Sequence, residues 1–562
     1  MKRKPLNITG SLSGGGMVLV AVVLVCFVWG CCQCAVPRQE PVSTKSTKST
    51  KTKTGPRLQE PLVVSRHALA REAGYRILEA GGNAFDAFVA VTAVENVVSS
   101  GYVTFAGLLS VLLYHGKSGQ TMYLDAGFNS VLDPAGVYDS SDTGDGKKIV
   151  VPGVVAGLEV LSKKYGRLNF TQAIQPALEI AENGFVIDET FAGYLEADAA
   201  KIQRTEYGRK TFFPGGKLLR AGDILKQPEL AHTLANLAKQ GAAYMYTGEW
   251  ASRCVETVRN EGGLMTLQDL ASYRPTWCQP WTMSYRGYEI HASSGRCMYG
   301  LLVLLALKTL EHTNLKALGH FSVSAEALET LVRVVEAVSS EKWLKNVELL
   351  DNRESVNSRL TPAYTEGIWE KVRQGLEKES RRAEPPGSCT LSSIVADKEG
   401  NVVSGKHSIN SDLWGNGLFV GGVLLNGSGD MRGRDLGPGR RRTQGAPNFL
   451  VFKDGTLRVA GGTFSLSNPQ AALQFLVNLL EYGLPVRQAV ELPRFGSYPY
   501  DIKTGDVDLT KIDLDERFSR DMVTTLEKRG LRFNQANPQL GKGCFAEFLP
   551  DGTVSTGTIW EY

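Results

Sequence analysis

The sequence has little net charge. Its 62 lysine and arginine residues stand against 58 aspartate and glutamate residues, which leaves a formal charge of +4 over 562 residues. Nucleic-acid binding needs basic side chains gathered on one face, so this balance gives no electrostatic case for such a partner. The most basic stretch, the arginines at 440–442, follows the turn residues 437–439, and we expect it to be a solvated loop.

Metal-binding and nucleotide-binding motifs are also lacking. Five of the nine cysteines lie beyond the N-terminal region, and no two of these five form a C-x-x-C pair: Cys254, Cys278, Cys297, Cys389 and Cys544. A zinc ribbon or a thioredoxin-like site is therefore not indicated. With no nucleotide loop either, we expect no metal and no other cofactor.

The sequence has one long apolar run, at its N-terminus. Residues 17–32 are almost wholly apolar, the run can be extended to residue 36, and basic residues precede it at 2–4. A helix of roughly twenty such residues crosses a bilayer. Two interpretations stay open: a transmembrane signal anchor at 17–36 behind an N-terminal tail of residues 1–16, which the length favours, or a signal peptide lost near Cys34.

Both interpretations send the rest of the chain into the secretory pathway. We expect a single-pass membrane protein with the chain beyond the apolar run on the lumenal or extracellular side, or a secreted protein if the segment is cleaved. The sequon at Asn169, a candidate glycosylation site, agrees with this location. Residues 37–61, rich in serine, threonine and lysine, predict a disordered stalk because they carry too little apolar surface to fold.

Helical patterns dominate the first half of the remaining chain, which is too long for one simple core. Residues 65–80 carry apolar side chains at helical spacing and end at two glycines. A second helix is expected from Asn83, a natural N-cap, to Val98. Residues 170–380 also have a mainly helical pattern.

The pattern changes to extended segments at Thr390. Apolar runs at 391–396 and 402–409 flank a Lys-Glu-Gly-Asn turn at 398–401, which predicts a β-hairpin. Further strands are expected at 417–425, 449–452 and 456–460. A helical half thus precedes a strand-rich half, and the boundary falls between Cys389 and Thr390.

Several separated motifs occur along the chain, at residues 81–87, 151–157, 165–168, 175–177, 181–185, 262–270, 397–401, 424–426 and 493–495. In this order they resemble the motifs of the γ-glutamyltransferase family of N-terminal-nucleophile hydrolases, and the likeness runs from Leu62 nearly to the C-terminus. The resemblance implies an α+β protein with an αββα sandwich, made as an inactive precursor. In this family a threonine cleaves the peptide bond that precedes it.

The resemblance places this nucleophile at Thr390, with cleavage between Cys389 and Thr390. It implies a large subunit of residues 62–389 and a small catalytic subunit of residues 390–562, which remain associated as a heterodimer. It places Ser408 at a residue whose hydroxyl bonds the nucleophile, and Asn410 at a substrate-binding asparagine. Because a threonine hydroxyl is a weak nucleophile, the α-amine freed by cleavage is expected to act as its base.

The substrate pocket departs from the family pattern. An arginine that holds the α-carboxylate of the glutamyl group is replaced by Gly127, which offers no equivalent of a guanidinium. In the segment that contacts the substrate amine, here residues 426–431, Asp430 is the one carboxylate that remains. A pair of serines on the carboxylate has become Thr443 and Gln444.

The oxyanion-binding glycines are also altered. The ungapped register puts Phe464 and Ser465 at their positions, while Gly461 and Gly462 lie three residues earlier. Two adjacent backbone N–H groups are what the tetrahedral intermediate requires. A small shift in register would bring Gly461 and Gly462 into this role.

The sequence therefore predicts an autoprocessed threonine-nucleophile enzyme. The resemblance implies that it cleaves or transfers the γ-glutamyl group of glutathione, of its conjugates or of a related amide, and the altered pocket points to a changed donor. Two alternatives stay open: a non-catalytic, membrane-tethered family member, and an acylase that acts on a non-glutamyl amide. The donor and the acceptor are not fixed by the sequence.

Overall fold

The computed structural model describes residues 53–137, 145–374, 389–430, 437–464, 467–496, 511–536 and 540–560. All of these belong to one unit, Lys51–Tyr562. Among them, no helix is long and apolar enough to span a bilayer. The apolar helix α12 (Met298–Leu310), for example, has 13 residues, fewer than the roughly twenty required. This finding corrects the expected single-pass membrane location, and the predicted tail at 1–16 and anchor at 17–36 lie outside the described residues.

Two six-stranded sheets form the centre of the unit, and every pairing within them is antiparallel. The first sheet has the order β1 (Leu62–Val64), β9 (Thr390–Ala396), β10 (Val402–Ser408), β2 (Leu108–His115), β3 (Gln120–Ala126) and β6 (Thr276–Cys278). The second has the order β18 (Val554–Ile559), β17 (Gly543–Phe548), β14 (Thr456–Thr463), β13 (Asn448–Lys453), β8 (Tyr288–Ala292) and β7 (Trp281–Tyr285).

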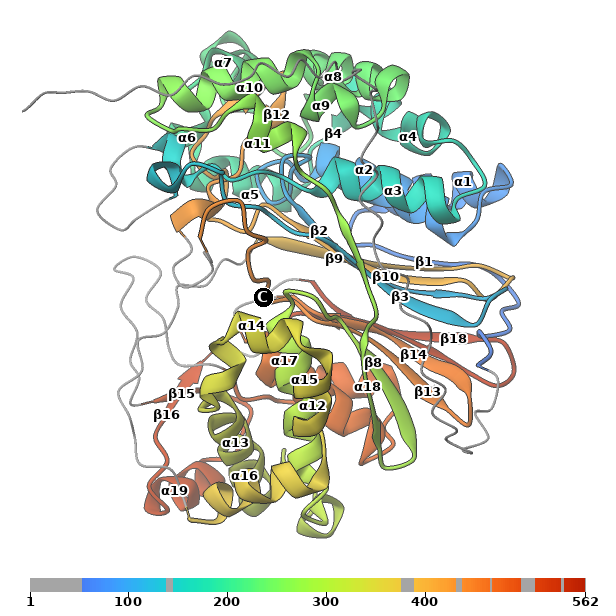
Figure 1. Ribbon diagram of the computed structural model, residues 1–562, viewed down its shortest axis with the longest axis vertical. Helices are drawn as coiled ribbons and strands as arrows, with labels where there is room; N and C mark the ends of the chain where they lie inside the picture. Colours follow the sequence, from blue (N-terminus) through green and yellow to red (C-terminus); the bar gives the residue numbers. More distant parts are fainter. Residues whose placement is uncertain are drawn as a thin grey trace, which may run out of the picture. The chain divides into compact units, whose positions relative to one another are not determined.

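One helical layer covers the outer face of each sheet (Figure 1). The layer on the β9–β10 sheet consists of α1 (Ala68–Glu79), α2 (Ala84–Val98), α3 (Val154–Tyr165), α4 (Phe170–Asn183), α5 (Glu189–Ala197), α6 (Ala199–Ile202), α7 (Glu206–Phe212), α8 (Pro228–Gln240), α9 (Ala243–Tyr246), α10 (Glu249–Asn260) and α11 (Leu267–Ala271). The layer on the β13–β14 sheet consists of α12, α13 (Ala325–Ser339), α14 (Val347–Asp351), α15 (Arg353–Arg359), α16 (Pro362–Gln374), α17 (Asn468–Leu480), α18 (Val486–Glu491) and α19 (Arg520–Lys528). The predicted αββα sandwich is confirmed.

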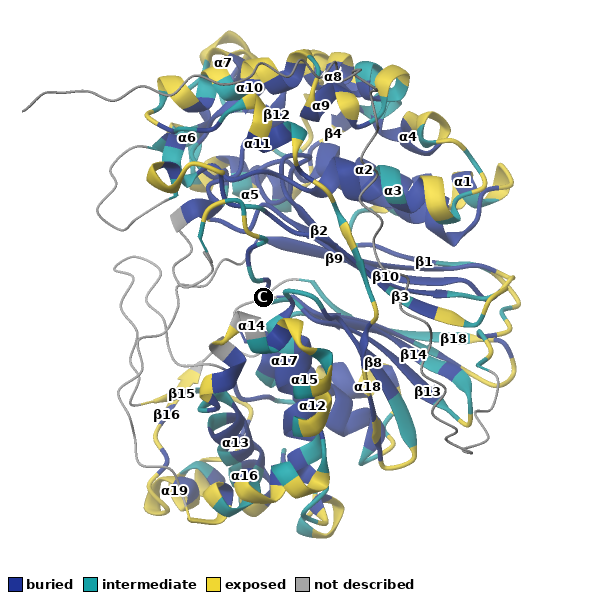
Figure 2. Ribbon diagram, viewed as in Figure 1, coloured by how far each residue is buried: buried dark blue, intermediate teal, exposed yellow. Residues whose placement is uncertain are grey.

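In the described part of the chain, three pairs of short strands lie outside the two sheets. They are β4 (Phe185–Val186) with β5 (Ile224–Leu225), β11 (Phe419–Val420) with β12 (Val423–Leu424), and the parallel pair β15 (Ile512–Asp515) with β16 (Phe533–Ala536). Burial follows the layers, since the central strands and α2 are buried while exposed residues gather on the outer helices (Figure 2). Separate apolar clusters fill the space beneath each helical layer, and a third lies between the sheets.

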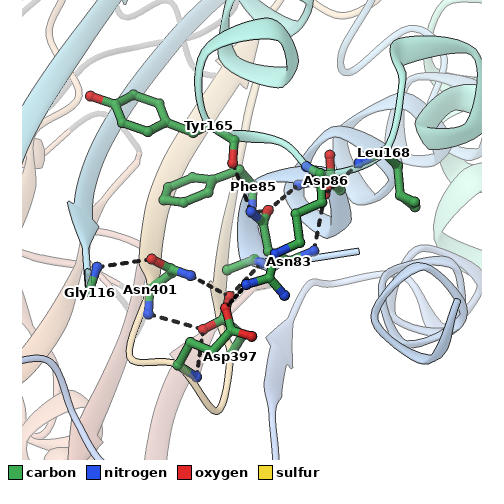
Figure 3. Close-up of polar contacts among 11 residues, drawn as sticks. Asn83, Phe85, Asp86, Gly116, Tyr165, Leu168, Asp397 and Asn401 are labelled. Carbon is green, nitrogen blue, oxygen red and sulfur yellow. Dashed lines mark hydrogen bonds and ion pairs between the residues drawn. The ribbon is translucent and has the colours of Figure 1, made fainter. Parts of the chain in front are cut away.

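The β9–β10 hairpin is fixed to α2 through Asp397 in its turn, and Asn401 of the same turn bonds Asp397 (Figure 3). One Asp397 carboxylate oxygen accepts from the Ala84 backbone N–H at 2.9 Å and from Asn401 Nδ2 at 2.8 Å. The other accepts from the backbone N–H groups of Glu399 and Asn401, each at 3.0 Å. Asn83 caps α2 in a capping box with Asp86, as its position in the sequence predicts.

The region of residues 170–380 contains strands as well as the expected helices. β7 and β8 form a hairpin whose two turn residues, Arg286 and Gly287, have φ angles of 47° and 79°. This is the conformation of a type I′ turn, which is usually marked by an Asn-Gly or Asp-Gly pair. The Arg-Gly pair gives a weaker signal for a turn. The alternation of buried and exposed residues in β7 covers only five residues, and helical patterns dominate the sequence around it.

The last part of the expected stalk is ordered. Thr54 bridges to Thr456 at the start of β14, and the Gln59 backbone N–H donates to the Gly552 carbonyl at 3.1 Å. Lys53 lies 2.6 Å from Glu289 on β8. The described structure therefore begins at Lys53 rather than at Leu62, because the second sheet and its turns offer backbone partners to a segment that has few apolar side chains of its own. Residues 37–52 of the expected stalk lie outside the described residues.

Candidate active site

Thr390 begins β9 and lies directly opposite Ser408, the last residue of β10. The Thr390 hydroxyl donates a hydrogen bond to Ser408 Oγ at 3.0 Å. The two residues are 7% and 2% exposed, respectively. Directly opposed residues in an antiparallel pair bring their side chains together on one face, so the tightly turned hairpin is what sets this pair.

Ser408 also contacts the peptide bond that precedes Thr390. Its hydroxyl donates to the carbonyl oxygen of Cys389 at 2.5 Å, and it accepts from the backbone N–H of Asn410 at 2.7 Å. A serine hydroxyl has one proton and two lone pairs. All three are used here, so the orientation of the Ser408 hydroxyl is fixed: it accepts from Thr390 and Asn410 and donates to Cys389.

The opposite face of the hairpin is anchored on α2. His407 Nε2 lies 2.7 Å from a carboxylate oxygen of Glu95, and Ser393 Oγ donates to the other oxygen at 2.8 Å. Both Glu95 and His407 are buried. These two contacts with Glu95 tie both strands of the hairpin to the helical layer. The other face of the hairpin, which carries Thr390 and Ser408, is left for chemistry.

Gln444 occupies the region of the expected carboxylate-binding residues. Its side-chain Nε2 donates to Asp125 Oδ1 at 2.7 Å, and both residues are buried. A Cβ atom added to Gly127 would lie 2.5 Å from that Nε2. The space into which a side chain at position 127 would project is therefore filled by Gln444.

The other expected substrate-binding residues are placed less fully. Asp430 ends a short 3-10 helix, Ser428–Asp430, and its side chain lies outside the described part. Thr443 is partly buried beside Gln444. Asn410, which donates to Ser408, is 9% exposed. The structure thus brings Thr390, Ser408 and Asn410 together.

Gly461 and Gly462 lie inside β14, which pairs with β13 on one side and β17 on the other. Successive N–H groups of a strand point to opposite neighbours, so this position does not direct both toward one oxyanion. Phe464, which the ungapped register places at the oxyanion site, donates its N–H to the Lys542 carbonyl at 3.0 Å, and Ser465 lies outside the described residues.

Sequence reasoning did not single out Lys406, which lies two residues before Ser408 on β10. It is fully buried, its ammonium donates to the Pro447 carbonyl, and a Cβ on Gly462 would lie 2.6 Å from Nζ. Burial lowers the pKa of this amine to about 7. A lysine inside a strand predicted to be buried, after the apolar and small residues 402–405, is the signal that could have revealed it.

The prediction that the arginines at 440–442 form a solvated loop is wrong for two of the three residues. Arg442 is 3% exposed and donates to the Ser428 carbonyl at 2.6 Å. Arg441 packs on the ring of Tyr273 and donates to the carbonyl of Gly127. Backbone carbonyls replace water around both guanidinium groups. The expectation that a short run of charged residues faces water does not anticipate such partners.

Asn169, the expected glycosylation site, is exposed at the N-terminus of α4. Its side-chain oxygen accepts from the Gln172 backbone N–H at 2.8 Å, and the Gln172 side chain accepts in return from the Asn169 N–H. The asparagine therefore serves as a helix cap.

The model of one protein family, gamma-glutamyltranspeptidase, matches residues 70–558. The chain belongs to the gamma-glutamyltranspeptidase family. It is 30% identical over 463 residues to the glutathione hydrolase-like YwrD proenzyme of Bacillus subtilis (strain 168), covering 77% of this chain and 84% of that protein. It is 28% identical over 482 residues to the glutathione hydrolase proenzyme of Escherichia coli (strain K12), covering 78% and 81%.

The relatives of this chain also include acylases. The acylase ACY 1 proenzyme of Pseudomonas sp. (strain SE83) is 27% identical over 536 residues, with 89% of this chain and 92% of that protein covered. The crystal structure of cephalosporin acylase from Bacillus halodurans has a TM-score of 0.74 at 22% identity, covering 93% and 99%. That structural likeness shows that the two proteins share a fold. The predicted family and enzyme class are confirmed.

Proposed function

We propose that this chain is a precursor that cleaves itself between Cys389 and Thr390 and then uses Thr390 as a nucleophile on γ-glutamyl amides such as glutathione. The observation that carries the proposal is the directed chain of hydrogen bonds from Thr390 through Ser408 to the Cys389 carbonyl. The products are a large subunit, residues 62–389 with the segment before it, and a small subunit, residues 390–562, which form a heterodimer. The proenzyme relatives support this processing.

The first step follows the two hydrogen bonds. Thr390 Oγ bonds to the carbonyl carbon of Cys389, its proton passes to Ser408, and the Ser408 proton passes to the Cys389 oxygen. The carbon–nitrogen bond then breaks, and that proton moves to the nitrogen of Thr390, which leaves an ester on Thr390 Oγ. Water hydrolyses the ester to a Cys389 carboxyl group and a free Thr390 hydroxyl. General acid–base help of this kind contributes about 10²–10⁴-fold to a rate.

The second step uses the new N-terminus. The free α-amine of Thr390, with a reference pKa of about 7.7–8.0, takes the hydroxyl proton as Thr390 Oγ attacks the substrate amide. The amine of the substrate leaves with a proton, and the acyl group remains as an ester on Thr390. Water completes a hydrolysis, whereas an amine acceptor completes a transfer. Ser408 and Asn410 keep their places beside the nucleophile.

The acyl donor is the point at which a second candidate function has support. Gln444 and Asp125 fill the space at Gly127, so residue 127 offers the glutamyl α-carboxylate no guanidinium, and the neighbouring Arg441 guanidinium already donates to the Gly127 carbonyl. This favours, as the second candidate, an acylase acting on an amide whose acyl group lacks an α-carboxylate. Asp430, Thr443 and Gln444 are the proposed residues that line the donor site.

Expression of the wild type and of Thr390→Ala tests the proposal. The wild type is expected to give two fragments on a denaturing gel, and Thr390→Ala one uncut chain. The processed protein is then assayed with γ-glutamyl-p-nitroanilide, glutathione and a series of simple acyl-p-nitroanilides. Turnover of acyl but not γ-glutamyl substrates selects the acylase, and an uncut wild-type chain contradicts both candidates.

A further inference from the structure

Asn410 has an unusual backbone conformation for a residue with a side chain. Its φ angle is +52°, in the left-handed region that glycine adopts freely and other residues seldom occupy. Such a conformation persists only where the surrounding structure holds it. It is needed here because the Asn410 N–H donates to Ser408 Oγ only while the chain turns back after β10.

Ser428 holds this turn from outside the hairpin. Its hydroxyl, which is fully buried, points at two successive carbonyl oxygens, that of Ile409 at 2.7 Å and that of Asn410 at 2.9 Å. One donor placed between two carbonyls fixes the orientation of both peptide planes. The turn that follows Ser408 is therefore clamped by a single hydroxyl.

Arg442 in turn holds Ser428. Its Nη1 donates to the Ser428 carbonyl at 2.6 Å, and its Nη2 lies 3.5 Å from the Gly429 carbonyl. Its own backbone N–H donates to the Phe128 carbonyl at 2.9 Å. A planar guanidinium with several fixed donors can bind two successive carbonyls at once, and an ammonium cannot do this in the same geometry.

We propose that Ser428 and Arg442 are positioning residues that hold Asn410 left-handed and thereby aim the Ser408 hydroxyl at the bond to be cut. This inference rests on the self-cleavage proposed above. With Thr390 and Asn410 on its two lone pairs, Ser408 directs its only proton to the Cys389 carbonyl. Without the clamp Asn410 relaxes, one lone pair of Ser408 is freed, and the proton is no longer held toward Cys389.

The first test is a time course of self-cleavage for Ser428→Ala. We expect the cleavage rate to fall at least about tenfold, the effect of losing one well-placed hydrogen bond in the reacting geometry. Thr309→Val is the matched control, since its buried hydroxyl donates to the Leu305 carbonyl at 2.9 Å within α12. It is expected to cleave at the wild-type rate, even where its melting temperature falls as far as that of Ser428→Ala. Arg442→Lys is expected to slow cleavage too.

A compensating change separates positioning from general damage. Because glycine adopts positive φ without a clamp, Ser428→Ala with Asn410→Gly is expected to cleave faster than Ser428→Ala alone. In the uncut Thr390→Ala background, hydrogen exchange of the peptide around Asn410 is expected to quicken on Ser428→Ala. A wild-type cleavage rate or unchanged exchange in Ser428→Ala overturns the inference, whereas an uncut wild type overturns the proposed function and leaves the exchange measurement to test the clamp.

Discussion

The side-chain amide of Gln444 fills the space in front of Gly127. A Cβ atom at position 127 would lie 2.5 Å from Gln444 Nε2 and 3.0 Å from Asp125 Oδ1. The glycine, the glutamine and the aspartate therefore form one packed unit at the end of β3. Any change in acyl specificity that adds a side chain at position 127 has to move Gln444 as well.

Gly127→Ala is accordingly expected to destabilise the fold by about 1–3 kcal/mol, because the added methyl displaces the amide that bonds Asp125. Gln444→Ser in the same chain is expected to make room, so that the double variant loses less than the sum of the two single changes. Urea unfolding of Thr390→Ala versions measures this. Gly193→Ala is the control, since a Cβ there meets nothing within 4 Å in the helix α5, and additive losses at 127 and 444 would contradict the coupling.

Ser408→Ala is expected to slow self-cleavage about 10²-fold or more, because the Thr390 proton loses its route to the Cys389 carbonyl. Ser408→Thr keeps the hydroxyl and is expected to cleave much faster than the alanine variant. Ser404→Ala serves as the control, because Ser404 is also buried on β10 and its hydroxyl bonds Asn448 Oδ1 at 3.3 Å. Equal slowing by the changes at 404 and 408 would argue against a relay.

Lys406 makes stability depend on pH. Burial lowers its pKa from 10.5 to about 7, so between these values the unfolded chain binds a proton that the folded chain does not. Stability therefore rises with pH across this window, and the cost of the buried amine is fully present below pH 7. Lys406→Met removes that cost. In the Thr390→Ala background, we expect the free energy of unfolding of the Lys406→Met chain to exceed that of the Lys406 chain most at pH 6–7. The difference is expected to shrink toward pH 10.

Urea unfolding at pH 6.5, 8 and 9.5 measures this difference. A gap between the lysine and methionine chains that stays constant over the three pH values would contradict a lowered pKa at Lys406. Lys398→Met is a suitable control, since its ammonium is exposed and pairs with Glu60.

Asp397 is expected to matter for stability rather than for chemistry. Its carboxylate accepts from Ala84, Glu399 and Asn401, and hydrogen bonds to a charged group contribute about 1.5–3 kcal/mol each. Asp397→Ala should lower the free energy of unfolding by several kcal/mol. Correctly folded protein should still cut itself before Thr390, which an intact-mass measurement on the soluble fraction checks; a stable but uncut variant would contradict this division.

Local patterns made part of the fold predictable. The cap at Asn83, the helix that follows it and the turn before Val402 are each fixed by neighbours a few residues away. Once the hairpin is fixed, Thr390 and Ser408 have to face each other, which agrees with the positions that the family resemblance gave to these two residues.

Contacts between distant segments were not predictable in this way. Gln444 meets Asp125 across 319 residues, and nothing local to either residue announces the pairing. Arg442 lies in a run of charged residues that is typical of a solvated loop. Its guanidinium is nevertheless bound by the backbone carbonyls of Ser428 and Gly429. The clamp from Ser428 to Asn410 likewise depends on backbone direction, which residue types alone do not encode.

The most direct measurement of the central claim is the N-terminal sequence and intact mass of the fragments from the purified wild-type protein. The account predicts a small fragment that begins Thr390-Leu391-Ser392 and a large fragment that ends at Cys389. A single uncut chain, or a fragment beginning at any other residue, would contradict it.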